Sequence, residues 1–268
     1  MTLVLPPHDL ECQAVQLSAD IYLPMAQLQA KYPSAIIREA GCDRFMVWKC
    51  FPYIFVVFMG THDFWSLLSD FDMKRHRASI GHGEVHEGFD QGVEELWSDL
   101  LAAIHSLGDG DCFLVWTGHS RGATQTIMSA GRYAAWVELR DDPPVTKTRW
   151  ILPIAPARPG DAVYRNWYNS LLGDVTFCYT HGADIVPWES PYVLGNRGVG
   201  HRVWFPDLVA PGATAPRMLD PSLGQLLPGC SELTIRGWVN RPRQFEQLSD
   251  HRVVEYCNMI QGAVTASK

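Results

Sequence analysis

The sequence FLVWTGHSRGATQTIMSAG, residues 113–131, joins an apolar run to a helical pattern through one serine that lies between two glycines. An unbroken apolar run is typical of a strand buried on both faces. A strand that turns directly into a helix forces the turning residue into a strained conformation and leaves its hydroxyl above the sheet edge. Gly118 and Gly122 are small enough for the strand and helix to approach each other. We therefore predict that Ser120 is a nucleophile; the alternative is a glycine-bounded N-cap serine.

The rest of the chain predicts the same alternation of strands and helices. Short apolar runs bounded by turn residues predict strands at 44–50, 53–58, 112–116, 150–155 and 174–180. Apolar residues at helical spacing predict helices at 11–31, 90–107, 121–139 and 251–260. Apolar strands that alternate with helices indicate a sheet covered on both faces. The segment 189–240 is rich in Gly, Pro and Arg, which predicts irregular structure. We expect one α/β domain over residues 1–268.

Composition narrows the function classes. Of the 268 residues, 47% are hydrophobic and 19% are charged, which is typical of a globular protein. The net charge of −7 argues against nucleic acid as the main partner. The first residues lack the basic segment of a secretory signal, and no apolar run is long enough for a membrane span. We therefore expect a cytoplasmic protein, with signal-independent export as the alternative.

The seven cysteines lie far apart and form no Cys-x-x-Cys pair. This pattern predicts reduced thiols and neither a disulfide framework nor a zinc site. We expect no metal and no cofactor.

Two further segments supply partners for the serine. A serine hydroxyl needs a base to remove its proton, and the base needs an acid to orient it. In a fold with this elbow the expected order is Ser, then Asp or Glu, then His. The sequence CYTHGADIVPW (178–188) places Asp184 after an apolar strand, and QLSDHRVVEYC (247–257) places His251 before the last helix.

Taken together, these motifs resemble the class 3 lipases, the fungal triacylglycerol lipase type of α/β hydrolase. The resemblance covers most of residues 11–260, and its elements follow the family's order. The matching segments are VVFMGTHDFWSLLSDF (56–71), which resembles the oxyanion turn and lid, VHEGF (85–89), TGHSRGA (117–123), APARPGD (155–161), HGADIVPW (181–188), GHRVWF (200–205) and DHRVVEY (250–256).

The resemblance implies an α/β-hydrolase fold, which has a mostly parallel central sheet with helices on both faces. It also implies that Ser120 is the nucleophile, Asp184 the orienting acid and His251 the base. Two preorganised backbone donors stabilise the oxyanion that forms during acyl transfer. The candidates are the N–H groups of Thr61, after Gly60, and of Arg121, at the start of a helix. Acylglycerols or phospholipids are the implied substrates.

Several positions depart from the family pattern. Met59 stands where the family usually has Arg, and Arg121 stands where it usually has Leu. The backbone N–H of Arg121 can still donate, but its side chain places a charge near the pocket. Ala123 replaces a second glycine. The spacing from His251 to Tyr256 is longer than the family's.

Other residues compete for these roles. His201 is the rival base, and Asp161 and Asp174 are weaker candidates for the acid. His82 and His86 flank Glu84, but a zinc helix needs the order His-Glu-x-x-His, and the neighbouring glycines disfavour a helix.

Two segments bear on membrane contact. Residues 63–71 place apolar side chains on one helical face, which predicts either a helix packed on the core or a lid that meets a lipid surface. Lys74–Arg77 predicts a solvated surface turn, with attraction to anionic headgroups as the alternative. The expected partners are therefore a lipid or ester substrate and, transiently, a lipid surface; the oligomeric state is left open.

The sequence also leaves other functions open. They are a short-chain esterase or thioesterase without interfacial activation, a toxin-like lipase that acts on membranes, and a catalytically silent binding protein on the same fold.

Overall fold

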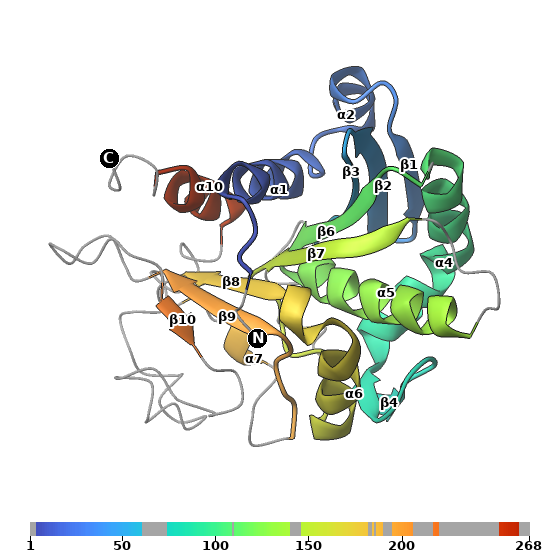
Figure 1. Cartoon of the computed structure of the whole chain (residues 1–268), viewed down its shortest axis with the longest axis vertical. Helices are drawn as coiled ribbons and strands as arrows, with labels where there is room; N and C mark the ends of the chain where they lie inside the picture. Colours follow the sequence, from blue (N-terminus) through green and yellow to red (C-terminus); the bar gives the residue numbers. More distant parts are fainter. Residues whose placement is uncertain are drawn as a thin grey trace, which may run out of the picture.

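The computed structural model describes residues 4–60, 74–108, 110–139, 146–181, 184, 186–189, 195–205, 217–219 and 252–262. Eight of its strands form one sheet, in the spatial order β1, β2, β3, β6, β7, β8, β9, β10 (Figure 1). Their bounds are β1 Ile36–Ala40, β2 Asp43–Cys50, β3 Tyr53–Phe58, β6 Phe113–His119, β7 Lys147–Ile154, β8 Phe177–His181, β9 His201–Phe205 and β10 Arg217–Leu219. In this sheet β3, β6, β7, β8 and β9 run parallel to one another, and β1, β2 and β10 pair antiparallel with their neighbours.

Helices cover both faces of this sheet (Figure 1). Helices α1 (His8–Asp20) and α10 (Val253–Gly262) lie side by side on one face. Helices α4 (Glu87–Leu107), α5 (Arg121–Glu138) and α6 (Ala162–Leu172) lie on the other. The predicted α/β class, with a mostly parallel sheet between helical layers, is confirmed.

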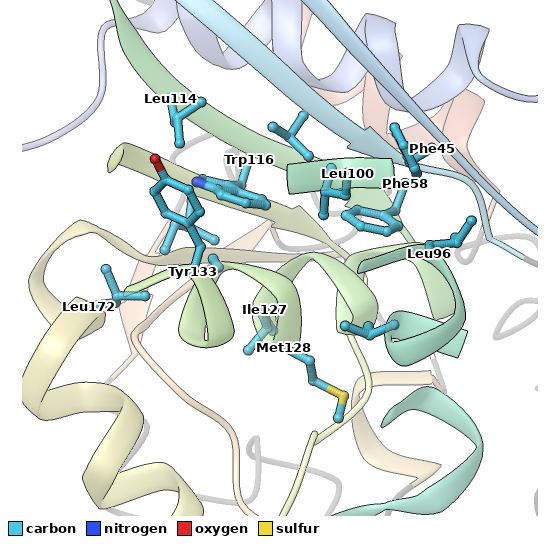
Figure 2. Close-up of a cluster of buried hydrophobic side chains, with 14 of the residues drawn as sticks. Phe45, Phe58, Leu96, Leu100, Leu114, Trp116, Ile127, Met128, Tyr133 and Leu172 are labelled. Carbon is cyan, nitrogen blue, oxygen red and sulfur yellow. The ribbon is translucent and has the colours of Figure 1, made fainter. Parts of the chain in front are cut away.

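Each face of the sheet has its own apolar core, which explains why the strands read as continuous apolar runs. In β6, Leu114 and Trp116 point toward α4 and α5, whereas Val115 points toward α1. Figure 2 shows the first of these cores, in which side chains from β6 meet those of the helices below. Its labelled members are Phe45, Phe58, Leu96, Leu100, Leu114, Trp116, Ile127, Met128, Tyr133 and Leu172.

The structure corrects some predicted boundaries. The helix expected over 11–31 is divided into α1 and α2 (Met25–Lys31), because Pro24 precedes α2 and has no N–H for a continuous helix. The prediction of irregular structure over 189–240 is wrong in part, because this segment contains β9 and β10. These strands have five and three residues, too few to show a clear period among the surrounding Gly and Pro residues. The expected surface turn at 74–77 contains β4 (Arg75–Arg77), which pairs with β5 (Glu84–His86) in a second, two-stranded sheet.

Two short helical elements flank β8. A 3-10 turn, Gly173–Val175, precedes β8, and the short helix α7 (Val186–Glu189) follows β8. The segment predicted as a lid or core helix, 63–71, lies outside the described residues. Within the described part of the chain, no helix has the length and apolar character that crossing a membrane requires.

Candidate active site

Ser120 forms the turn between β6 and α5. Its backbone angles are φ 59° and ψ −125°, in a region that costs a residue other than glycine about 1–3 kcal/mol. The Ser120 N–H donates to the carbonyl of Ile154 at the end of β7 (2.9 Å), and the Ser120 carbonyl accepts from the amides of Ala123 (3.0 Å) and Thr124 (3.2 Å). These bonds hold the strained turn in place. The predicted strand–turn–helix setting of Ser120 is therefore present.

The two flanking glycines allow the close approach that the elbow requires. A Cβ atom on Gly118 would lie 2.8 Å from the backbone of Gly122 and from the carbonyl of Phe58. A Cβ atom on Gly122 would lie 2.4 Å from the same carbonyl. Any side chain at either position would therefore push α5 away from β3.

The end of β3 lies directly against the elbow. A Cβ atom on Gly60 would lie 2.5 Å from the carbonyl oxygen of His119 and 3.3 Å from the Cβ of Ser120. The Gly60 N–H donates to the Tyr22 hydroxyl (3.1 Å), which is also 3.1 Å from Nδ1 of His119. Burial raises the pKa of Tyr22 above its ordinary value, so this hydroxyl stays protonated. Thr61, the predicted oxyanion donor, follows Gly60 and lies outside the described residues.

Asp184 is held in a buried position after β8. Only 1% of the residue is exposed, and its carboxylate accepts from the Tyr256 hydroxyl (2.5 Å, Oδ2) and from the amide of Val186 (3.0 Å, Oδ1). Its own N–H donates to the carbonyl of His181 (2.9 Å). Buried carboxylates need such donors to remain charged.

Tyr256 connects this carboxylate to the neighbourhood of Ser120. The Tyr256 ring centroid is 6.2 Å from that of His119 at the end of β6 and 5.9 Å from that of His181 at the end of β8. Tyr256 lies in α10, which begins two residues after His251. His251 itself lies outside the described residues. The described structure therefore brings the carboxyl ends of β6 and β8 and the first turns of α10 to one edge of the sheet.

The Arg121 side chain pairs with an acid far away in the sequence. Its Nε and Nη2 donate to the two carboxylate oxygens of Asp43 at 2.9 and 3.0 Å, and Nη2 also lies 3.2 Å from the carbonyl oxygen of Gly88. Burial opposes the charge, but the hydrogen bonds and charge of Asp43 raise the pKa of Arg121 above its ordinary value. The positive charge of the Arg121 side chain is therefore paired with Asp43, and the guanidinium lies between β2 and α4.

Residues 55–193 match the family of class 3 lipases, and this segment is more than half of the chain. The chain belongs to the class 3 lipase family. As a member of it, the protein is a serine hydrolase that acts on lipid esters. Curated protein sequences contain no significant match to the chain.

Solved structures of fungal lipases share the fold of this class 3 lipase. Lipase II from Rhizopus niveus has a TM-score of 0.63 and 19% identity, with 79% of this chain and 84% of that chain covered. The triacylglyceride lipase of Rhizomucor miehei has a TM-score of 0.63 and 18% identity, with 74% and 80% covered. A triacylglycerol lipase whose catalytic centre is a serine protease triad has a TM-score of 0.61 and 18% identity, with 74% and 80% covered.

The rival residues of this class 3 lipase lie elsewhere. His201 is paired with Phe177 in the register of β8 and β9, which places it at the amino end of the parallel strands, the edge opposite Ser120. Asp161 accepts from the amide of Tyr164 (2.8 Å) and caps α6. Asp174 lies in the 3-10 turn before β8, also at the amino end. His201 and Asp174 therefore lie at the edge opposite Ser120, and the Asp161 carboxylate is engaged as the N-cap of α6.

Of the two histidines around Glu84, His86 lies in β5 and His82 lies in the bend before it. Glu84 and His86 are in β5, where neighbouring side chains point to opposite faces, so the segment is not a zinc helix. Among the described residues, no three His, Cys, Asp or Glu side chains gather where they could hold a metal ion.

Sequence reasoning missed three residues that contact the candidate site: Tyr22, Asp43 and Tyr256. The sequence shows Tyr256 only through its spacing from His251, and the helical pattern over 11–31 includes Tyr22 as an ordinary helix residue. Asp43 gives no signal, because it begins a strand 78 residues before its partner Arg121. Only a motif with a fixed spacing would reveal such partners in a single sequence.

Proposed function

We propose that this class 3 lipase hydrolyses acylglycerols or phospholipids through an acyl-enzyme on Ser120. In this proposal, His251 takes the proton of the Ser120 hydroxyl as the oxygen attacks the ester carbonyl, and then protonates the departing alcohol. Asp184 orients the imidazole and stabilises its charged form. Water activated by His251 then attacks the acyl-enzyme, which releases the fatty acid and restores Ser120.

The amides of Arg121 and Thr61 are the proposed oxyanion donors. The Arg121 amide belongs to the first turn of α5, where N–H groups have no partner within the helix and the positive end of the helix dipole favours an anion. Gly60 contacts the elbow from the opposite side, so the next amide along the chain is the second donor. Its own N–H is not, because it donates to Tyr22.

The observation that carries this proposal is the conformation of Ser120. The protein holds a residue other than glycine at φ 59°, between a parallel strand and a helix, with Gly60 packed against it. Such strain persists only where the surroundings over-determine it, and it is found at sites where it serves the reaction.

A fluorophosphonate probe, which reacts with activated serines, tests the mechanism. The wild-type protein should be labelled at Ser120, and Ser120→Ala and His251→Ala should not react. His201→Ala is the matched control, because the mutated histidine lies at the opposite edge of the sheet, and this variant should react at the wild-type rate. Loss of labelling in His201→Ala with retention in His251→Ala would overturn the assignment of the base.

A panel of esters tests the substrate class. Ser120 is 2% exposed, so an ester must displace covering atoms to reach it. Triacylglycerols, phospholipids and nitrophenyl esters of increasing chain length should be compared below and above their solubility limits. We expect long-chain lipids to be preferred and the rate to rise when a lipid–water interface forms. Equal rates on both sides of the limit, with short chains preferred, would favour the esterase alternative.

Similarity to fungal lipases supports this choice of substrates. Two of the similar structures are triacylglycerol lipases, and a further fungal lipase has been crystallised with an inhibitor as a model for interfacial activation. A thioesterase would instead prefer acyl thioesters of matched length. Toxicity upon expression that disappears in Ser120→Ala would favour the toxin-like alternative.

A further inference from the structure

We infer that Asp43 is a positioning residue for the oxyanion donor at residue 121, acting through a buried ion pair with the Arg121 side chain. The inference rests on the proposed function, because it assumes that the Arg121 amide binds the oxyanion. Asp43 itself touches no reacting atom in this scheme. Its carboxylate instead determines where the first turn of α5 begins.

The first turn of α5 lacks the usual restraint at a helix start. Its N-cap residue is Ser120, whose side chain makes no capping hydrogen bond to the helix. A serine hydroxyl used for capping would be unavailable as a nucleophile, and an uncapped first turn is prone to fraying. The Asp43–Arg121 pair supplies a restraint at this point, because it fixes the side chain of the first residue of α5 to β2.

The geometry of the pair is rigid. The guanidinium of Arg121 donates through two parallel bonds to Asp43, and such a fork fixes orientation as well as distance. The third bond, to the carbonyl of Gly88, joins the pair to the first turn of α4. The guanidinium carbon also lies 5.8 Å from the centre of the Phe89 ring. Asp43 is 4% exposed, so solvent screens this interaction little.

Helix α4 is shaped to make room for the pair. A Cβ atom on Gly92 would lie 2.3 Å from Oδ2 of Asp43, 2.6 Å from Nε2 of Gln125 and 3.2 Å from Nη2 of Arg121. Only glycine lets α4 approach these polar groups. The pair therefore joins β2, α4 and α5 in one contact that leaves little room for movement.

The start of β2 also contacts the other side of the candidate oxyanion hole. The next residue, Arg44, accepts from the amide of Met59, which precedes Gly60 (2.9 Å). The Arg44 side chain donates to the carbonyls of Ile21 and Leu23, on either side of Tyr22 (both 2.9 Å). Two consecutive residues of β2 thus hold the segments on both sides of Ser120. Strand β2 therefore contacts both the first turn of α5 and the residues that lead to Gly60.

The test compares Asp43→Asn with Arg121→Leu, Arg121→Lys and a control. Arg132→Leu is the matched control, because Arg132 also lies in α5, forms an ion pair with Glu94 of α4 and is three turns from Ser120. For each variant, kcat and KM for a soluble short-chain nitrophenyl ester, the affinity for an alkyl boronic acid and the melting temperature are measured. The boronic acid forms a tetrahedral adduct that resembles the oxyanion intermediate.

We expect kcat to fall about tenfold to a hundredfold in Asp43→Asn and Arg121→Leu, the range expected when a reacting group is displaced by about 1 Å. KM should change less than about threefold, and boronic acid affinity should fall in parallel with kcat. Arg121→Lys, which keeps the charge without the fork, should be intermediate. Arg132→Leu should lower the melting temperature by a similar amount and leave kcat and boronic acid affinity unchanged.

Several results would overturn the inference. One is a wild-type kcat in folded Asp43→Asn; another is an equal loss of kcat in Arg132→Leu. If Asp43→Asn and Arg121→Leu do not fold, a wild-type kcat in both Arg121→Lys and Gly92→Ala counts against the inference. Failure of the proposed function has a different signature: the wild-type protein itself would not react with the fluorophosphonate probe.

Discussion

The hydroxyl of Tyr256 donates to Oδ2 of Asp184 at 2.5 Å and accepts from the amide of His181 at 2.9 Å. The two side chains are 72 residues apart in the sequence. This one hydroxyl ties α10 to the end of β8 and holds a buried carboxylate in a fixed orientation. Because α10 begins just after His251, the same bond sets the position of the proposed acid relative to the segment that carries the proposed base.

Replacing Tyr256 with Phe should therefore lower both stability and activity. The buried carboxylate loses a donor, which costs about 1–3 kcal/mol in the free energy of unfolding, measured by urea denaturation. We also expect kcat to fall while KM changes little. Tyr168→Phe is the control: its buried hydroxyl is 3.0 Å from that of Thr176, at the amino end of β8. A comparable loss of kcat in the control would show that the effect reflects stability alone.

Tyr22→Phe removes the oxygen that accepts the Gly60 N–H. Gly60, which precedes Thr61, then loses its hydrogen bond to Tyr22. Because a proposed oxyanion donor follows Gly60, we expect kcat to fall about tenfold with KM nearly unchanged. Tyr32→Phe removes a hydroxyl bonded to Asp20 at 2.6 Å and serves as the control in the same part of the chain. Unchanged kcat in Tyr22→Phe would mean that Gly60 is held by other contacts.

Gly122→Ala should disturb the elbow, whereas Gly88→Ala should not. The new Cβ at position 122 would lie 2.4 Å from the carbonyl of Phe58, and overpacking of this kind costs about 1–3 kcal/mol or more. At Gly88, also in the first turn of a helix, the nearest atom is a ring carbon of His86 at 3.6 Å. Urea denaturation and probe labelling of both variants test the difference. A fully stable and reactive Gly122→Ala would contradict the packing argument.

Alkylation should distinguish exposed from buried thiols. Burial raises the pKa of Cys178 to about 12 and of Cys257 to about 11, so at pH 8 only about one in 10,000 and one in 1,000 of these groups is the reactive thiolate. Cys42 is exposed. We expect iodoacetamide to modify Cys42 in the folded protein and the two buried thiols only in urea, as measured by peptide mass spectrometry. Equal modification of Cys178 and Cys42 in the folded state would contradict this.

The local features of this protein could be predicted from its sequence. Gly118, Ser120 and Gly122 predict the elbow because a strand-to-helix turn has a fixed spacing of small residues around the serine. The helical spacing of 90–107 and the apolar runs of 53–58 and 112–116 predict α4, β3 and β6 for the same reason. Motif order then supported Asp184 and His251 as partners of the serine; the roles of these residues stay predictions.

The contacts between side chains from distant segments could be found only in the folded structure. Arg121 pairs with Asp43, Gly60 donates to Tyr22, and Tyr256 donates to Asp184. His201 lies at the edge of the sheet opposite Ser120. The structure also showed β9 and β10, where the sequence had predicted irregular structure. These contacts depend on the order and register of strands that are far apart in the chain. Long-range pairing of this kind leaves no periodicity and no fixed spacing in the sequence itself.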